Sequence, residues 1–169
     1  MVPEQRNTFN QNFTEHKYEQ LLSELNKDFE GAIDFRVAET PVFLDANCNR
    51  QMLDTCNYII DKIVDSNFTA QTNGAIPANK NVPNQTAHPH FLAFDFGICM
   101  SEQNEPVPQL IEMQGFASLF GYQAHLDDAM RSTYEIHEPY TAYYGGFNKT
   151  SYLQKLQSVI VGHHDPKQV

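Results

Sequence analysis

The sequence predicts a mixed α/β (α+β) fold in which a β-hairpin belongs to a sheet flanked by helices. In several segments apolar residues recur at steps of three and four, which is typical of amphipathic helices. Two other segments, residues 91–99 and 107–114, are short and apolar and flank the polar, turn-prone stretch S-E-Q-N-E-P, which favours a hairpin. The composition, with 41% hydrophobic and 12% aromatic residues, is typical of a globular protein.

The first predicted helix begins at Asn12, after a polar stretch (residues 1–11) that we expect to be irregular. Asn12 and Glu15 have the spacing of a capping box, and Gly31 is a natural stop. Two short extended pieces, F-R-V and P-V-F-L, should follow. A second helix is then expected, capped by Asp45 or Asn47. Its inward face is predicted to contain Met52, Leu53, Cys56, Ile59, Ile60 and Ile63.

The stretch from residue 66 to residue 90 is rich in Asn and Pro and has no periodicity, which predicts a long surface loop. After the hairpin, a helix is expected from Ser118 through Met130, and then an irregular aromatic segment, residues 134–147. A last helix should begin at a cap formed by Asn148 or Thr150 and end at Gly162.

The length of 169 residues predicts a single domain, residues 1–169. A net charge of -10 with scattered basic residues argues against nucleic acid as a partner. No apolar segment reaches the ~20 residues that span a bilayer, and the N-terminus lacks the apolar core of a signal peptide. We therefore expect a cytoplasmic protein without a membrane partner, whose cysteines (Cys48, Cys56 and Cys99) are buried, reduced thiols.

The candidate functional residues, which are side chains with oxygen donors, lie in the predicted hairpin. Asp95 stands in its first apolar segment, and Glu112 and Gln114 stand in the second. With the turn centred on Gln103 and Asn104, Asp95 faces Glu112 at a Cβ distance of about 5 Å. Two carboxylates at that distance repel each other unless a proton or a cation intervenes. Because carboxylate and amide oxygens are ligands of hard cations, Asp95, Glu112 and Gln114 predict a Mg²⁺ site.

Alternation along the strands predicts how the hairpin faces are used. The residues of the first strand that should face the core are Leu92, Phe94, Phe96 and Ile98. The small residues on the opposite face should leave room for a ligand above Asp95. In the second strand Leu110 should share the face of Glu112.

Other interpretations of the same residues stay open. Asp95 and Glu112 could be solvated residues on the open face of an antiparallel sheet. The pattern D…E-x-Q also approaches a D…E-x-K nuclease core, but it lacks the lysine. His88 and His90 have the spacing of a cupin metal motif, with the wrong parity relative to Asp95. Gly145-Gly146 before a helix could bind a phosphate or form a tight turn, and the turn is the simpler interpretation.

The segments F-L-A-F-D-F-G-I-C (residues 91–99) and P-Q-L-I-E-M-Q-G-F-A-S-L (residues 108–119) resemble the metal-binding strands of ATP-grasp ligases. In that superfamily a strand with Asp precedes a strand of the pattern hydrophobic-hydrophobic-E-x-N, and these residues hold the Mg²⁺ ions that bridge the ATP phosphates. The resemblance implies Asp95, Glu112 and Gln114 as the metal ligands, with ATP and Mg²⁺ as cofactors. This sequence has Gln114 where Asn is commoner, which keeps the oxygen donor on a longer side chain.

The early position of these strands is similar to the circularly permuted branch of ATP-grasp proteins, which includes glutathionylspermidine-synthase-like proteins. In that branch the nucleotide-gripping half follows the metal strands. The chain ends after H-H-D-P, where an alternating α/β pattern would place another strand. We therefore expect it to be a fragment, the N-terminal part of a longer ATP-grasp-like protein.

The resemblance implies an ATP-dependent carboxylate–amine or carboxylate–thiol ligase that acts on a small-molecule carboxylate through an acyl phosphate. No catalytic protein nucleophile is expected, because the substrate carboxylate attacks the nucleotide. The alternative is a non-catalytic interaction or scaffold module that retains the fold. Because its basic residues are scattered, we expect the 169-residue chain alone to bind Mg-ATP weakly or not at all, and to be inactive.

Overall fold

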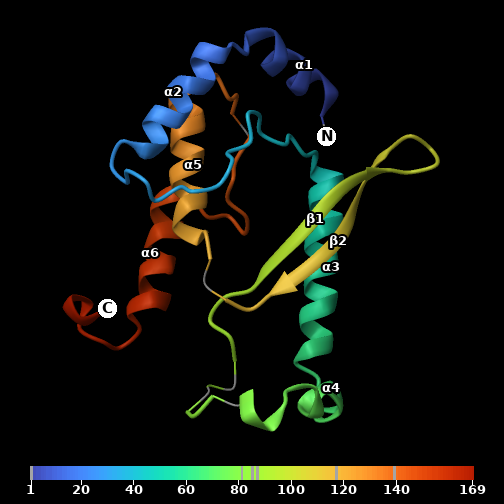
Figure 1. The fold of residues 1–169 in the computed structure, drawn as a ribbon. Coiled ribbons are helices and arrows are strands. Elements are labelled where there is room, and N and C mark those ends of the chain that lie inside the picture. Colours follow the sequence, from blue (N-terminus) through green and yellow to red (C-terminus); the bar gives the residue numbers. More distant parts are fainter. Residues whose placement is uncertain (1, 81, 85, 87, 117, 139) are drawn as a thin grey trace. The chain divides into compact units, whose positions relative to one another are not determined.

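The computed structural model describes residues 2–80, 82–84, 86, 88–116, 118–138 and 140–169 (Figure 1). These residues form a mixed helical and β structure, as the sequence predicts, with one antiparallel sheet of two strands. The helices are α1 (Pro3–Asn12), α2 (Glu15–Asn26), α3 (Ala46–Ile63), α4 (Ser66–Thr72), α5 (Phe120–Thr133) and α6 (Lys149–Val161). The strands are β1 (Ala93–Met100) and β2 (Pro106–Gln114). Short 3-10 turns are η1 (Asn73–Ala75), η2 (Ala78–Lys80) and η3 (Pro166–Gln168).

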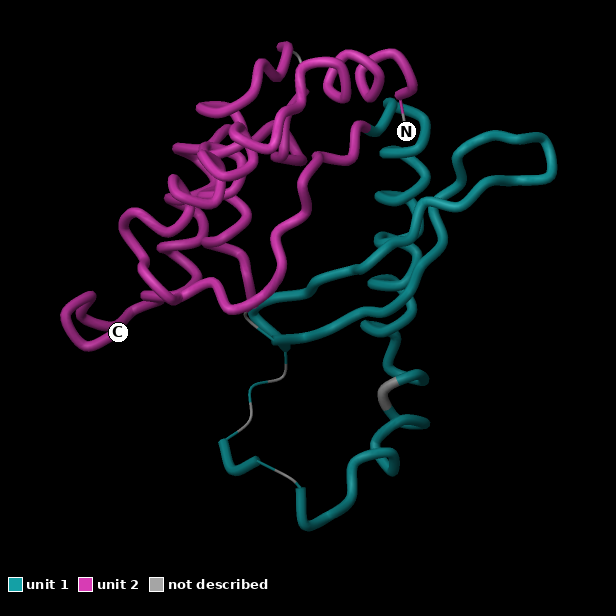
Figure 2. Tube along the Cα trace, turned by 45° about the horizontal axis from the view of Figure 1, so that its top comes forward, with its two compact units in different colours: residues 1, 44–116 teal, residues 2–43, 117–169 magenta. Residues whose placement is uncertain are grey.

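The chain divides into two compact units (Figure 2). The hairpin unit consists of residues 44–116 and contains α3, α4 and both strands. The helical unit combines residues 2–43 with residues 117–169 and contains α1, α2, α5 and α6. That the chain is one domain stays a prediction, because compact units need not fold independently.

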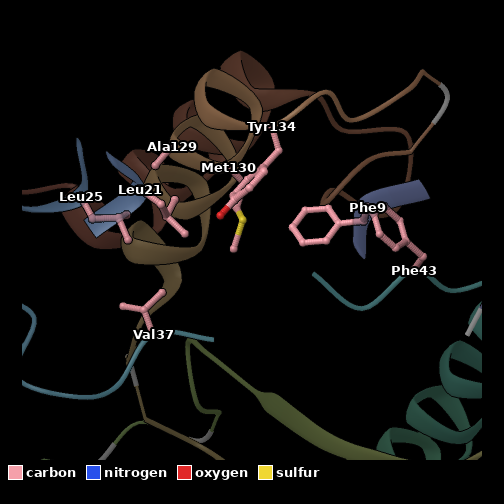
Figure 3. Packing of buried hydrophobic residues seen from close by; sticks show 8 residues of the cluster. All are labelled: Phe9, Leu21, Leu25, Val37, Phe43, Ala129, Met130 and Tyr134. Carbon is pink, nitrogen blue, oxygen red and sulfur yellow. The ribbon is translucent and has the colours of Figure 1, made fainter. Parts of the chain in front are cut away.

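The helical unit contains a continuous apolar core. Leu21 and Leu25 on α2 are fully buried, and α2 packs against α5. The ring of Phe9 lies between those of Phe43 and Tyr134, with centroid distances of 6.2 and 4.7 Å. Figure 3 shows the whole cluster, which comprises Phe9, Leu21, Leu25, Val37, Phe43, Ala129, Met130 and Tyr134.

Two predictions for the N-terminal region are wrong. Residues 3–12 are helical rather than irregular, because Pro3 suits the first helical turn and Phe9 is buried in the core. The cap of α2 is Thr14, whose hydroxyl accepts from the Lys17 amide at 3.2 Å, instead of Asn12. The segments F-R-V and P-V-F-L form no regular strand, although each contributes one side chain to the core.

Other helix ends match the sequence. Asp45 caps α3 by accepting from the Cys48 amide at 2.8 Å. Asn148 and Ser151 form a reciprocal capping box at the start of α6. Gly162 follows α6 with φ of 55°, a left-handed value that a side chain disfavours.

In the hairpin unit, α3 lies against β2. The predicted inward face of α3 is half-buried, except for Leu53, which is 39% exposed. Among the described residues of this unit, Cys48 is the only apolar side chain that is fully buried. The predicted loop of residues 66–90 begins instead with the short helix α4 and continues through η1 and η2, while residues 81, 85 and 87 lie outside the described ones.

Candidate metal-binding site on the hairpin

The strand register places the predicted ligands on one face of the hairpin. Asp95 pairs directly with Glu112, and Ala93 pairs with Gln114. Since residues two apart on a strand point the same way, Asp95, Glu112 and Gln114 share one face. This is the arrangement that alternation and the turn position predict.

A β-bulge directly follows the carboxylate pair. Asp95 pairs with Glu112, whereas the next residue, Phe96, pairs with Leu110, so Ile111 is the additional residue of β2. Leu110 therefore lies on the face of Phe96, and the prediction that it shares the face of Glu112 is wrong. Bulges change the direction of neighbouring side chains and are frequent beside functional sites.

The bulged Ile111 lies over Gly97. A Cβ atom added to Gly97 would lie 3.6 Å from Cδ1 of Ile111. The room that the small residues leave on this face is thus partly occupied by Ile111, beyond Asp95 along the strand. On the other side of Asp95, the Gln114 side chain contacts its carboxylate.

Gln114 is hydrogen-bonded to Asp95 across the strands. Its Nε2 donates to Oδ2 of Asp95 at 3.1 Å. Asp95 and Glu112 are exposed, and Gln114 is half-buried. In this rotamer the amide nitrogen faces the carboxylate, so joint binding of a cation requires the amide to turn by about 180° and present its oxygen.

Within the described residues, the charges of the two carboxylates are not balanced by a salt bridge. No Lys or Arg forms an ion pair with Asp95 or Glu112 in the part of the chain that the structure describes. Within the same residues, no group of three or more His, Cys, Asp and Glu side chains could hold a metal ion. The candidate donor set is therefore limited to the two carboxylates and the Gln114 amide.

The end of β2 is approached by the segment that precedes β1. Pro89 lies near Gly115, whose added Cβ would be 3.8 Å from the proline Cβ. The neighbouring His88 and His90 are exposed. Neither histidine belongs to a described cluster of metal-binding side chains, and no cupin-like arrangement is formed among the described residues.

A proline-containing second strand and a tight turn fix the hairpin. Ser101 donates its amide to the Glu105 carbonyl at 2.9 Å, and the Glu105 amide donates to the Ser101 hydroxyl at 3.1 Å. Asn104 has a left-handed φ of 61°, which Asn tolerates better than most residues. Pro106 and Pro108 stand two residues apart, so both of their nitrogens lie on the same edge of β2.

The cysteines differ from one another in exposure. Cys48 is buried and Cys56 half-buried, and burial raises the pKa of both thiols. Cys99 is exposed on β1, on the face of Asp95, so the prediction that all three are buried is wrong for this residue. All three are free thiols, as predicted.

A second polar cluster, centred on Arg131 of α5, was not predicted from the sequence. Arg131 donates from Nε to both carboxylate oxygens of Asp127 at 3.1 Å, and its terminal nitrogen donates to the Tyr140 carbonyl at 2.5 Å. Burial and the charge of Asp127 raise the pKa of Tyr143. The i, i+4 spacing of Asp127 and Arg131 was the available signal, and these contacts fix the irregular segment to α5.

The glycine pair before α6 forms a turn. Gly145 and Gly146 have φ values of 63° and 76°, both in the left-handed region that favours glycine. The Phe147 amide donates to the Tyr144 carbonyl at 3.1 Å across this pair. These backbone angles account for both glycines without a ligand.

Comparisons with known proteins identified no relative of this chain. No protein-family model matches the sequence, and neither curated proteins nor solved structures match it. The described helices also include none that is both long enough and apolar enough to cross a membrane.

Proposed function

We propose that the hairpin is the divalent-metal-binding portion of an ATP-dependent carboxylate–amine or carboxylate–thiol ligase of the ATP-grasp type. The observation that supports this most is the direct opposition of Asp95 and Glu112, with Gln114 hydrogen-bonded to Asp95 on the same face. Two carboxylates and an amide oxygen are the donor types that Mg²⁺ prefers. The adjacent bulge, which changes the strand direction beside them, also fits a site.

In this proposal Asp95 and Glu112 position Mg²⁺, and Gln114 supplies the third oxygen after its amide has turned. The metal would neutralise negative charge on the ATP phosphates. In such a ligase an oxygen of the substrate carboxylate forms a bond to the γ-phosphorus and ADP leaves. An amine or thiol then attacks the acyl carbon, and phosphate leaves. No side chain of the chain needs to act as nucleophile.

Divalent-cation binding tests the proposal directly. Titration with Mn²⁺, a paramagnetic substitute for Mg²⁺, should show one weak site with Kd of about 0.1–1 mM, as expected for few protein ligands. Asp95→Asn or Glu112→Gln should weaken binding at least about tenfold, because each removes a charge from the pair. Glu102→Gln, an exposed substitution in the turn, is the matched control and should bind as the wild type does. Equal affinity in all four proteins would refute the site.

Nucleotide binding gives a separate test. Within the described residues no Lys or Arg forms an ion pair with Asp95 or Glu112, and the 11 basic residues are scattered along the sequence. Isothermal titration of this chain with Mg-ATP should therefore show no micromolar binding. Micromolar affinity would mean that these residues already form a complete nucleotide site.

A non-catalytic interaction module is the second candidate. It is favoured by the apolar side chains that the hairpin unit leaves exposed, among them Ile111 at 70% and Phe116 at 58%. If Mn²⁺ binding is unaffected by Asp95→Asn while substitution of Ile111 or Phe116 alters self-association or partner binding, this candidate replaces the ligase proposal.

A further inference from the structure

The two edges of the hairpin differ in their capacity to accept another strand. Ser101 and Glu105 are joined by a backbone hydrogen bond, and antiparallel pairs alternate between hydrogen-bonded and non-hydrogen-bonded types. Counting from that bond, Met100–Pro106 and Ile98–Pro108 are non-hydrogen-bonded pairs. Residues in such pairs direct their backbone N–H and C=O groups away from the partner strand.

The outer edge of β2 is therefore blocked. Pro106 and Pro108 occupy the positions whose nitrogens face outward, and proline has no N–H to donate. The bulge at Ile111 further disrupts the regular spacing of this edge. Prolines and bulges are two common devices that prevent pairing at an edge strand.

The outer edge of β1 has neither device. The outward positions are Phe94, Phe96, Ile98 and Met100, each with an N–H to donate. No Lys, Arg or Pro occurs in β1, and among the described strands it pairs only with β2. An apolar, regular edge of this kind is a template for a further strand.

We propose that β1 pairs antiparallel with β1 of a second copy of this chain, about a twofold axis at Gly97, and forms a four-stranded sheet. This register pairs Phe96 with Ile98 of the second copy, so outward-facing backbone groups meet one another. It places Asp95 opposite Cys99 of the second copy and thus avoids opposing like charges. An axis at Asp95 would instead set the two aspartates against each other.

The position of Ile111 favours a second copy over another strand. Ile111 is the most exposed large apolar side chain among the described residues, at 70%, and its Cδ1 lies over Gly97. With the axis at Gly97, two glycines without side chains oppose each other at a Cα distance of about 4.5 Å. The two Ile111 side chains then meet above the glycines, and each covers the other. The apolar surface is therefore complementary to itself at this register.

Sedimentation equilibrium of the full chain over about 1–500 μM tests the proposal. We expect a reversible dimer that salt strengthens, because each copy has a net charge of -10. Ile111→Lys should raise the dimer dissociation constant at least about tenfold, since it places two ammonium groups together. Val64→Lys, at a side chain that is 64% exposed beyond α3, is the matched control and should leave the constant unchanged. Circular dichroism at 222 nm checks that both variants are folded.

Disulfide trapping tests the register. In a Cys99→Ser background, Gly97→Cys should form an intermolecular disulfide under mild oxidation, because non-hydrogen-bonded opposite residues bring their Cβ atoms close. The wild-type Cys99 should not crosslink to its counterpart, as it lies opposite Asp95. A wild-type chain that stays monomeric over the whole range, equal dimerisation of Ile111→Lys and Val64→Lys, or a dimer that Gly97→Cys does not trap would each overturn the proposal.

Discussion

The two compact units differ most in how completely they bury apolar side chains. The helical unit encloses Leu21 and Leu25 entirely, whereas in the hairpin unit only Cys48, among the described apolar residues, is fully buried. An isolated two-stranded hairpin is marginal in water, so the hairpin depends on its packing against α3. Burial of apolar side chains, and with it the stability of the fold, is therefore concentrated in the helical unit. The side chains proposed as metal ligands lie in the hairpin unit, where Asp95 and Glu112 are exposed.

Core truncation should show the difference most strongly. Leu21→Ala should lower the free energy of unfolding by about 2–5 kcal/mol, because it removes a fully buried side chain and leaves a cavity. Ile111→Ala, on the exposed face of the hairpin, should change it by no more than about 0.5 kcal/mol at monomer concentrations. Urea unfolding followed by circular dichroism at 222 nm measures both, since the chain has no Trp for fluorescence. Equal effects of the two substitutions would contradict the comparison.

The two helix caps give a test of intermediate size, one in each unit. Asn148→Ala removes the capping box of α6, and Asp45→Ala removes the cap of α3. Each substitution should lower the free energy of unfolding by about 1 kcal/mol, because amide groups of the first turn lose their acceptor. Thermal or urea unfolding measures this change. Asn57→Ala, at an exposed position within α3, is the control and should cost nothing. If a cap substitution lowers the free energy of unfolding no more than Asn57→Ala does, that cap does not contribute to the stability of the protein.

Tyr134→Phe should have an effect of the opposite sign. The Tyr134 side chain is 4% exposed, and its hydroxyl has no hydrogen-bond partner among the described residues. Removing an unsatisfied buried hydroxyl should leave the free energy of unfolding unchanged or raise it by up to about 1 kcal/mol. Tyr18→Phe is the contrast, because its hydroxyl donates to the Val37 carbonyl at 2.8 Å. If Tyr134→Phe lowers the free energy of unfolding as much as Tyr18→Phe does, the Tyr134 hydroxyl has a hydrogen-bond partner in the folded protein.

The smallest expected effect is the contribution of Cys48 to the decline of the unfolding free energy at alkaline pH. Burial raises the pKa of Cys48 above its value in the unfolded chain, so the folded state favours the neutral thiol. This contribution to stability is complete below the unfolded pKa of about 8.5 and is lost as pH rises through the folded pKa. The unfolding free energy of Cys48→Ala should therefore decline less steeply than that of the wild type above about pH 8.5. Parallel declines would show that the thiol does not titrate with folding.

Some features follow directly from local patterns in the sequence. The stripe of α3, its Asp45 cap, the Asn148 cap and the Gly162 stop are each set by neighbours in the chain. The same holds for the pairing of Asp95 with Glu112, since strand alternation and one short turn are enough to define it.

Features that depend on contacts between residues far apart in the chain could not be predicted from local sequence patterns. Helix α1 is polar, and the periodicity of its residues is weak, but Phe9 packs between Phe43 and Tyr134 and holds it in place. The bulge at Ile111 leaves the apolar composition of β2 unchanged, so no pattern of residue types indicates it. The hydrogen bond from Gln114 to Asp95 likewise depends on a rotamer choice across the strands.

Local sequence patterns were enough to predict the mixed helical and β class, the capped ends of α3 and α6, and the face shared by Asp95, Glu112 and Gln114. Each of these depends on periodicity or on residues close in the chain. The three-dimensional structure was needed to show which helices form a core, which cysteine is exposed, and where the register of the hairpin shifts. These depend on the packing of segments far apart in the chain and on the exact strand pairing, to which the local pattern of apolar and polar residues is insensitive.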